Sequence, residues 1–168
     1  MIQNLVFALF SIVMIYAALS DLRSYTLPNF ISIILAVGAL AIFAVILPPF
    51  ELLAWHLGVA AIVFVVGFIL FMTGIFGGGD VKVISALALW FGPANFLGFF
   101  TLMAIFGGVL AIALLIFRRI PLSHNYLKYK MISGLHDKEE GIPYGVAIAI
   151  AALIEFPKTY MYQALGAF

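Results

Sequence analysis

Long runs of apolar residues, separated by short polar, glycine or proline breaks, dominate this chain and predict membrane-spanning helices. A helix needs roughly 20 apolar residues to cross a hydrocarbon core of about 30 Å. The candidate runs cover residues 5–20, 30–47, 52–73, 81–91, 96–117 and 143–156. We therefore expect an all-α, polytopic membrane protein of six transmembrane helices, organised as a single domain over residues 1–168.

The fourth and sixth runs are too short for a full crossing of the bilayer. At the helical rise per residue, run 81–91 is about 16 Å long and run 143–156 about 21 Å. Asp80 precedes the fourth run, so we expect it below the membrane surface, after irregular backbone at 74–79. Irregular backbone at that depth needs surrounding protein or a water-filled cavity. The sequence thus predicts a water-filled notch lined by Asp21, Asp80 and Tyr144.

The composition excludes a soluble globular domain. Apolar residues make up 66% of the chain and charged residues 9%, and the mean hydropathy is +1.25. Soluble domains average about 45–50% apolar and about 25% charged residues. The net charge of +1 gives no basis for nucleic-acid binding. Because the chain has no cysteine, disulfides, a thiol nucleophile and cysteine-ligated metals are excluded as well.

The histidines do not predict a metal site. His56 lies near the outer end of the third run, and we expect it to be an interfacial residue. His124 and His136 share one polar loop but lack the spacing that places two ligands on one helix face. Neither a metal ion nor a cofactor is therefore expected.

The basic residues predict the orientation of the chain in its membrane. Cytoplasmic loops carry an excess of lysine and arginine. With the N-terminus outside, the loops at 21–29, 74–80 and 118–142 and their flanks are cytoplasmic, and only Lys158 is left outside. The basic residues on the cytoplasmic side are then Arg23, Lys82, Arg118, Arg119, Lys128, Lys130 and Lys138.

Two acidic residues at membrane boundaries carry the candidate chemistry. Asp21 closes the first run and Asp80 opens the fourth, so two complete spans separate them and both lie on the same side. Two close carboxylates cannot both ionise cheaply and therefore share a proton. The ionised member can draw a proton from water while the protonated member donates to a substrate carbonyl. This pairing favours hydrolysis of an amide without a metal.

Roles without hydrolysis remain open for the two aspartates. Asp21 alone fits a boundary residue paired with Arg23, and Asp80 alone fits the cap of a helix beside Lys82. A small proton- or ion-coupled transporter would use the two carboxylates as a proton relay. A scaffold protein without catalytic activity would tolerate asparagine at both positions.

The motifs around the two aspartates resemble those of a known family. Gly77-Gly78-Gly79-Asp80 fits the Gly-x-Gly-Asp signature of intramembrane aspartyl proteases. The wider pattern resembles type IV prepilin peptidases, and most closely their small single-function members that serve tight-adherence (Flp) pili. Its further blocks are Val81-Lys82, Asp21-Leu22-Arg23, Leu27-Pro28-Asn29 and Pro143-Tyr144-Gly145.

The resemblance implies a bacterial inner-membrane endopeptidase whose catalytic pair is Asp21 and Asp80. Such enzymes remove the short basic leader from prepilins at the cytoplasmic face. It also implies that Gly77, Gly78 and Gly79 shape the active-site loop, with Lys82 and Arg23 in support. The remaining motif residues would be structural or substrate-facing: Pro28, Asn29, Pro143, Tyr144 and Gly145.

The chain departs from the larger family members, which carry a cytoplasmic insert with paired Cys-x-x-Cys motifs and also N-methylate the new pilin terminus. Here the loop after the first run is short and cysteine is absent. We therefore expect peptidase activity alone. In the long loop, an acidic group could attract the basic leader electrostatically. Its members are Asp137, Glu139 and Glu140.

Overall fold

The computed structural model describes residues 1–122, 128, 130–137 and 141–166, and every regular element in that part of the chain is helical. The all-α prediction is therefore confirmed for the described residues. The elements are α1 (Ile2–Ser24), α2 (Asn29–Ile46), α3 (Phe50–Met72), α4 (Gly78–Phe117), α6 (Lys130–His136), α7 (Tyr144–Glu155), the 3-10 turn η1 (Phe156–Lys158) and α8 (Tyr160–Leu165).

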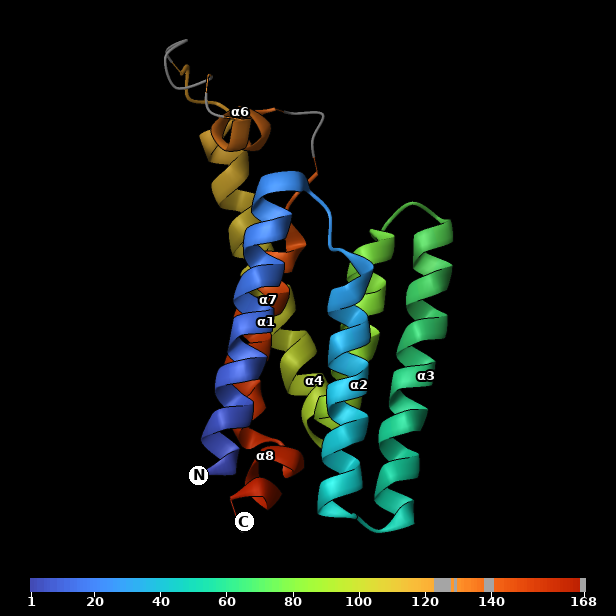
Figure 1. Cartoon of the computed structure of the whole chain (residues 1–168). Helices are drawn as coiled ribbons and strands as arrows, with labels where there is room; N and C mark the ends of the chain where they lie inside the picture. The colour runs from blue at the N-terminus through green and yellow to red at the C-terminus, as the bar shows by residue number, and fades with distance from the viewer. Residues whose placement is uncertain (123–127, 129, 138–140, 167–168) are drawn as a thin grey trace.

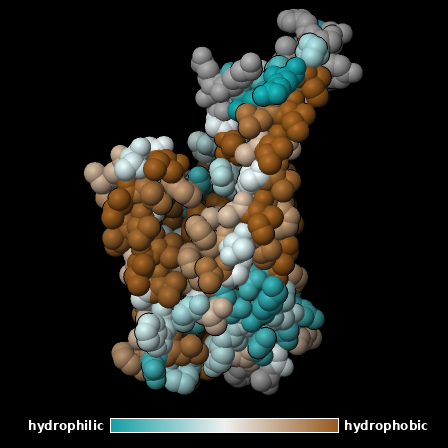
Figure 2. Space-filling view, turned by 180° about the vertical axis from the view of Figure 1, so that it is seen from behind, coloured by the Kyte–Doolittle hydropathy of each residue, from teal (hydrophilic) through white to brown (hydrophobic). Residues whose placement is uncertain are grey.

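The molecule is a membrane protein. Four helices, α1 to α4, are long and apolar enough to cross a membrane. Helices α1, α2 and α3 have aligned long axes, and α7 lies beside α1 and α4 (Figure 1). Apolar surface covers the middle of the molecule, with polar residues gathered at its two ends (Figure 2). The count of six transmembrane helices and the external N-terminus stay predictions.

Helix α4 folds back on itself. It spans 40 residues, but Gly92 inside it has non-helical angles, with φ 56 and ψ −170, and Pro93 follows. These backbone angles are essentially restricted to glycine. The chain reverses direction at this bend, so the arms 78–91 and 93–117 run in opposite directions (Figure 1). The sequence predicts a break in the helix between residues 91 and 96, whereas in the structure only Gly92 is non-helical.

Two helix ends differ from the sequence-based boundaries. Helix α1 continues to Ser24, so Asp21 lies within its last turn instead of following it. Helix α4 begins at Gly78, so Gly78 and Gly79 are helical, although the sequence predicts irregular backbone for both. Glycine permits unusual backbone angles but does not require them. The non-helical connection between α3 and α4 therefore covers only residues 73–77.

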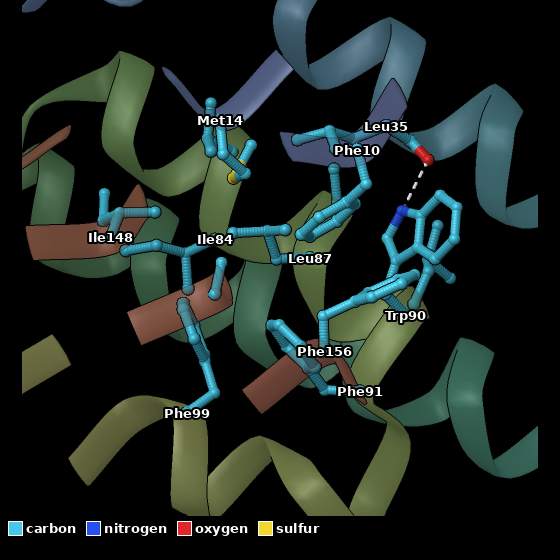
Figure 3. Packing of buried hydrophobic residues seen from close by; sticks show 14 of the residues in the cluster. Phe10, Met14, Leu35, Ile84, Leu87, Trp90, Phe91, Phe99, Ile148 and Phe156 are labelled. Carbon is cyan, nitrogen blue, oxygen red and sulfur yellow. Dashed lines mark hydrogen bonds between the residues drawn. The ribbon is translucent and has the colours of Figure 1, made fainter. Parts of the chain in front are cut away.

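The first arm of α4 forms the centre of the molecule. Within 81–92 every residue except Lys82 is buried. Side chains from α1, α2 and η1 surround it, among them Phe10, Leu35 and Phe156 (Figure 3). The indole N–H of Trp90 donates to the Leu35 carbonyl oxygen at 2.9 Å. A short helix can therefore sit at membrane depth here because other helices enclose it.

His56 is part of this packing, and its predicted interfacial position is wrong. The side chain is 2% exposed, and its Nδ1 lies 2.7 Å from the Leu89 carbonyl oxygen. The ring also fills the space beside Gly92, where a Cβ atom would collide with it. His56 is the buried residue through which α3 holds the bend of α4.

Candidate active site

A cavity of about 600 Å³ lies at the end of the molecule where α1 finishes and α4 begins. Asp21, Asp80 and Tyr144 all line it, as the sequence predicted for one notch. The remaining lining residues were not singled out from the sequence, apart from Gly77. They are Tyr25, Ile75, Phe76, Gly141 and Ile142.

The first aspartate is held by the start of α7. Asp21 is 5% exposed, and its Oδ2 accepts a hydrogen bond of 2.6 Å from the backbone N–H of Gly145. The first N–H groups of a helix have no partner within the helix and favour negative charge. A Cβ atom at Gly145 would lie 2.9 Å from that same oxygen, so the close approach requires glycine.

The second aspartate occupies the first turn of α4. Gly77 is the N-cap residue, and Asp80 follows it as the third residue of the helix. An acidic side chain at this third position lies where it can reach the N-cap backbone N–H. A Cβ atom at Gly77 would lie 2.8 Å from Asp80 Oδ2, so glycine leaves room for the carboxylate. The capping residue itself is Gly77 and not Asp80.

The two carboxyl groups belong to one site. They face the same cavity and interact electrostatically. Arg23 is exposed, and the hydrogen-bond partner that the structure shows for Asp21 is Gly145. The pairing of Asp21 with Arg23 is therefore not the arrangement observed.

A second set of contacts fastens the segment after Asp21 to the start of α4. Lys82 Nζ donates to Asn29 Oδ1 at 2.8 Å. A Cβ atom at Gly79 would lie 3.1 Å from the Leu27 carbonyl oxygen, so the backbone of this segment packs directly on α4. These contacts connect the two helix ends that carry Asp21 and Asp80.

The structure thus separates these motif residues into three groups. Gly77 and Tyr144 line the cavity with the two aspartates. Lys82 and Asn29 are exposed and pair with each other outside it. Pro28 and Pro143 are the N-cap residues of α2 and α7 and fix where these helices begin.

The sequence did not predict Tyr25 and Phe76 as lining residues, although each lies close in the sequence to one of the motifs. Tyr25 closes α1 four residues after Asp21 and has a positive φ of 54. Phe76 immediately precedes the glycine run, and its ring centroid is 6.4 Å from that of Tyr144. Gly141 and Ile142 come from the segment before α7.

The arrangement is suited to acid–base chemistry. Two carboxyl groups in one cavity can act as base and acid when they share one proton. Among the described residues no group of three or more His, Cys, Asp or Glu side chains could hold a metal ion. Of the acidic residues proposed to attract a basic leader, Glu139 and Glu140 lie outside the described residues.

Comparison with known proteins agrees with the motifs. A sequence profile of the type IV leader peptidase family matches residues 8–112, more than half of the chain. Neither a search of curated proteins nor a search of solved structures found a significant match. The matched region contains both Asp21 and Asp80, and the family is one of proteases. The chain therefore belongs to the type IV leader peptidase family.

Proposed function

We propose that the protein is an intramembrane aspartyl endopeptidase that removes the short basic leader from type IV or Flp prepilins. The observation that carries this proposal is the shared cavity of Asp21 and Asp80 in a member of the leader peptidase family. The ionised carboxyl group takes a proton from a water molecule, which attacks the scissile carbonyl. The protonated carboxyl group donates to the carbonyl oxygen.

The cavity is proposed to face the cytoplasm of a bacterium, across its inner membrane. Arg23 and Lys82 lie at the cavity end of the helices, together with Arg118 and Arg119 at the end of α4 (Figure 1). Lys158 lies in η1 at the opposite end. This distribution supports the positive-inside orientation. With both arms of α4 and with α7 counted as crossings, the chain has six and its N-terminus is outside.

A proton- or ion-coupled transporter remains the alternative use of the same two carboxylates. Transporters place their coupling site near the middle of the bilayer, between related halves. Asp21 instead lies in the last turn of α1, and Asp80 lies in the first turn of α4. This position at the helix ends favours the peptidase. Without the cysteine-bearing insert, we propose peptidase activity and no N-methylation.

Processing of a co-expressed prepilin tests the function. Asp21→Asn and Asp80→Asn, tested separately, should each lower the cleavage rate by about 10³-fold, because each removes one member of the acid–base pair. Glu51→Gln is the matched control, since Glu51 is in the first turn of α3, away from the cavity. Normal processing by either aspartate variant would contradict the mechanism.

A further inference from the structure

A second cavity, of about 300 Å³, lies between α3 and both arms of α4. Every side chain that lines it is apolar, which distinguishes it from the cavity of the two aspartates. Its walls include Val66 and Leu70 of α3, Val81 and Ile84 of the first arm, and Phe96 and Phe100 of the second arm.

The two cavities are neighbours. Phe76 lines both of them. Val81, the residue directly after Asp80, belongs to the wall of the apolar cavity. A chain that leaves the aspartates across Phe76 therefore passes from the cavity with the two carboxyl groups to an apolar one.

The apolar cavity is open toward the lipid. Val66 is 51% exposed and Leu97 is 72% exposed, although both line it. Helix α3 packs mainly against α4, and the surface on this side of the molecule is apolar (on the left in Figure 2). Gly67 allows the close packing beside the cavity, because a Cβ atom there would lie 2.7 Å from Val81 Cγ1. A membrane-embedded segment can therefore enter the cavity sideways.

We propose that this cavity, between α3 and α4, seats the apolar segment of the substrate that follows the scissile bond, with Phe76 between the leader side and the helix side. The inference rests on the proposed function, because it requires a substrate that is cut at the aspartates. The order of polar and apolar segments in the substrate matches the order of the two cavities. The polar leader lies at the aspartate cavity, and the apolar residues after the scissile bond lie in the apolar cavity.

An attached substrate segment competes well with lipid for this cavity. Lipid tails are as apolar as leucine, so burial of apolar surface alone gives no preference inside a membrane. Attachment to a leader already held at the aspartates raises the effective concentration of the segment at the cavity. Recognition then follows the pattern of a helix in a groove, with side chains at i, i+3 and i+4 as contacts.

Two adjacent valines of α3 provide a matched test. Val66 lines the cavity, whereas Val65 does not, and the two are similarly exposed at 51% and 56%. Val66→Trp should fill the cavity and raise KM for a full prepilin by about tenfold. Val65→Trp should leave that KM unchanged. An unchanged KM in the Val66 variant would overturn the proposal.

A short leader peptide that ends soon after the scissile bond serves as a second substrate. An equal rise in KM for this peptide in the Val66 variant would mean that tryptophan disturbs the aspartate cavity itself, which would also overturn the proposal. A rise confined to the full prepilin supports it. Failure of the unmodified enzyme to cut any prepilin would instead overturn the proposed function, so the two failures are distinguishable.

Photocrosslinking gives a measurement that does not depend on turnover. A photoreactive amino acid replaces Val66 or Val65 in the Asp80→Asn enzyme, which is then mixed with prepilin in vesicles. The expected result is a prepilin adduct at position 66 and none at 65, mapped to the apolar segment. Adducts with lipid alone at position 66 would overturn the proposal.

Discussion

The backbone N–H of Gly145 donates to Asp21 Oδ2 across 2.6 Å, although 124 positions separate the two residues in the sequence. Asp21 is thereby oriented by the first turn of α7. The family match ends at residue 112, so it includes both aspartates but not the group that holds the first of them. The segment after residue 112 therefore contributes a positioning group to the candidate active site.

Gly145→Ala should lower the cleavage rate. The added Cβ atom would lie 2.8 Å from Asp21 Cβ and 2.9 Å from its Oδ2, so the carboxylate must shift. A displacement of about 1 Å at a catalytic group can lower activity by about 10²-fold. We expect that loss in kcat for prepilin processing, with the thermal stability of the folded protein measured in parallel.

Gly58→Ala is the control for this substitution. Gly58 lies within α3, and a Cβ atom there meets nothing within 4 Å. The control should process prepilin like the unmodified protein. Equal rates for the Gly145 and Gly58 variants would show that the contact with Asp21 does not position the carboxylate.

The hydrogen bond between Lys82 and Asn29 should contribute to activity only by positioning the two helix ends that carry Asp21 and Asp80. Lys82→Met or Asn29→Ala removes the link between α4 and the segment after Asp21. An exposed hydrogen bond contributes about 0.5–1.5 kcal/mol, so we expect about a fivefold lower kcat/KM in either variant. The double variant should be no worse than each single one, because both remove the same bond.

A double-mutant cycle in kcat/KM measures this coupling. Residues in direct contact show interaction energies of about 0.5–3 kcal/mol, whereas independent residues give additive losses. Additive losses for Lys82 and Asn29 would mean that each acts separately, for example on the substrate. The role of this pair in positioning would then be wrong.

The sequence predicted the meeting of Asp21 and Asp80 but not the contacts that fix their geometry. Because two complete spans separate the aspartates along the chain, both lie at one end of the molecule, whatever the side-chain packing. The Gly145 contact depends on how α7 packs against α1, which no local pattern reveals. Gly145 could be singled out only through the resemblance, which left its role as structural or substrate-facing.

The error at His56 has a related cause. A soluble helix reveals its buried face because polar residues occupy the other one. In α3 apolar residues surround the whole helix, and most of them are exposed. The sequence pattern therefore contained no information on which face meets α4. The burial of His56 follows instead from the bend at Gly92, whose missing side chain leaves room for the imidazole ring.

Two adjacent glycines of α4 should respond in opposite ways to substitution by alanine. A Cβ atom at Gly107 would lie 2.6 Å from Tyr144 Cε1, whereas one at Gly108 meets nothing within 4 Å. Gly107→Ala therefore displaces the Tyr144 ring, which lines the cavity, and should cost about 1–3 kcal/mol in stability. Gly108→Ala should be neutral or stabilising by about 0.5–1 kcal/mol, because alanine favours helix.

Thermal unfolding in detergent and prepilin processing together check this pair. We expect the Gly107 variant to unfold at a lower temperature and to process more slowly, since Tyr144 lines the cavity of the aspartates. The Gly108 variant controls for the change of residue type in the same helix. Indistinguishable variants would mean that Tyr144 adjusts freely and does not shape the cavity.

The bend of α4 should be the most sensitive glycine position in the molecule. At Gly92 the angles φ 56 and ψ −170 are unfavourable for any residue with a side chain, and the Cβ atom of alanine would collide with the His56 ring. Backbone strain of this kind costs about 1–3 kcal/mol, and the collision adds to it. We expect Gly92→Ala to lower the unfolding temperature strongly or to abolish the folded protein.

A second substitution separates the two causes. His56→Ala removes the ring and the collision with it, but it leaves the positive φ of residue 92 unchanged. Combined with Gly92→Ala it should therefore restore only part of the lost stability, measured as unfolding temperature against the His56→Ala protein alone. Complete restoration would show that the collision accounts for the whole effect. Since the bend lies at the far end of the first arm from Asp80, any variant that still folds should retain the aspartate cavity and its cleavage activity (Figure 1).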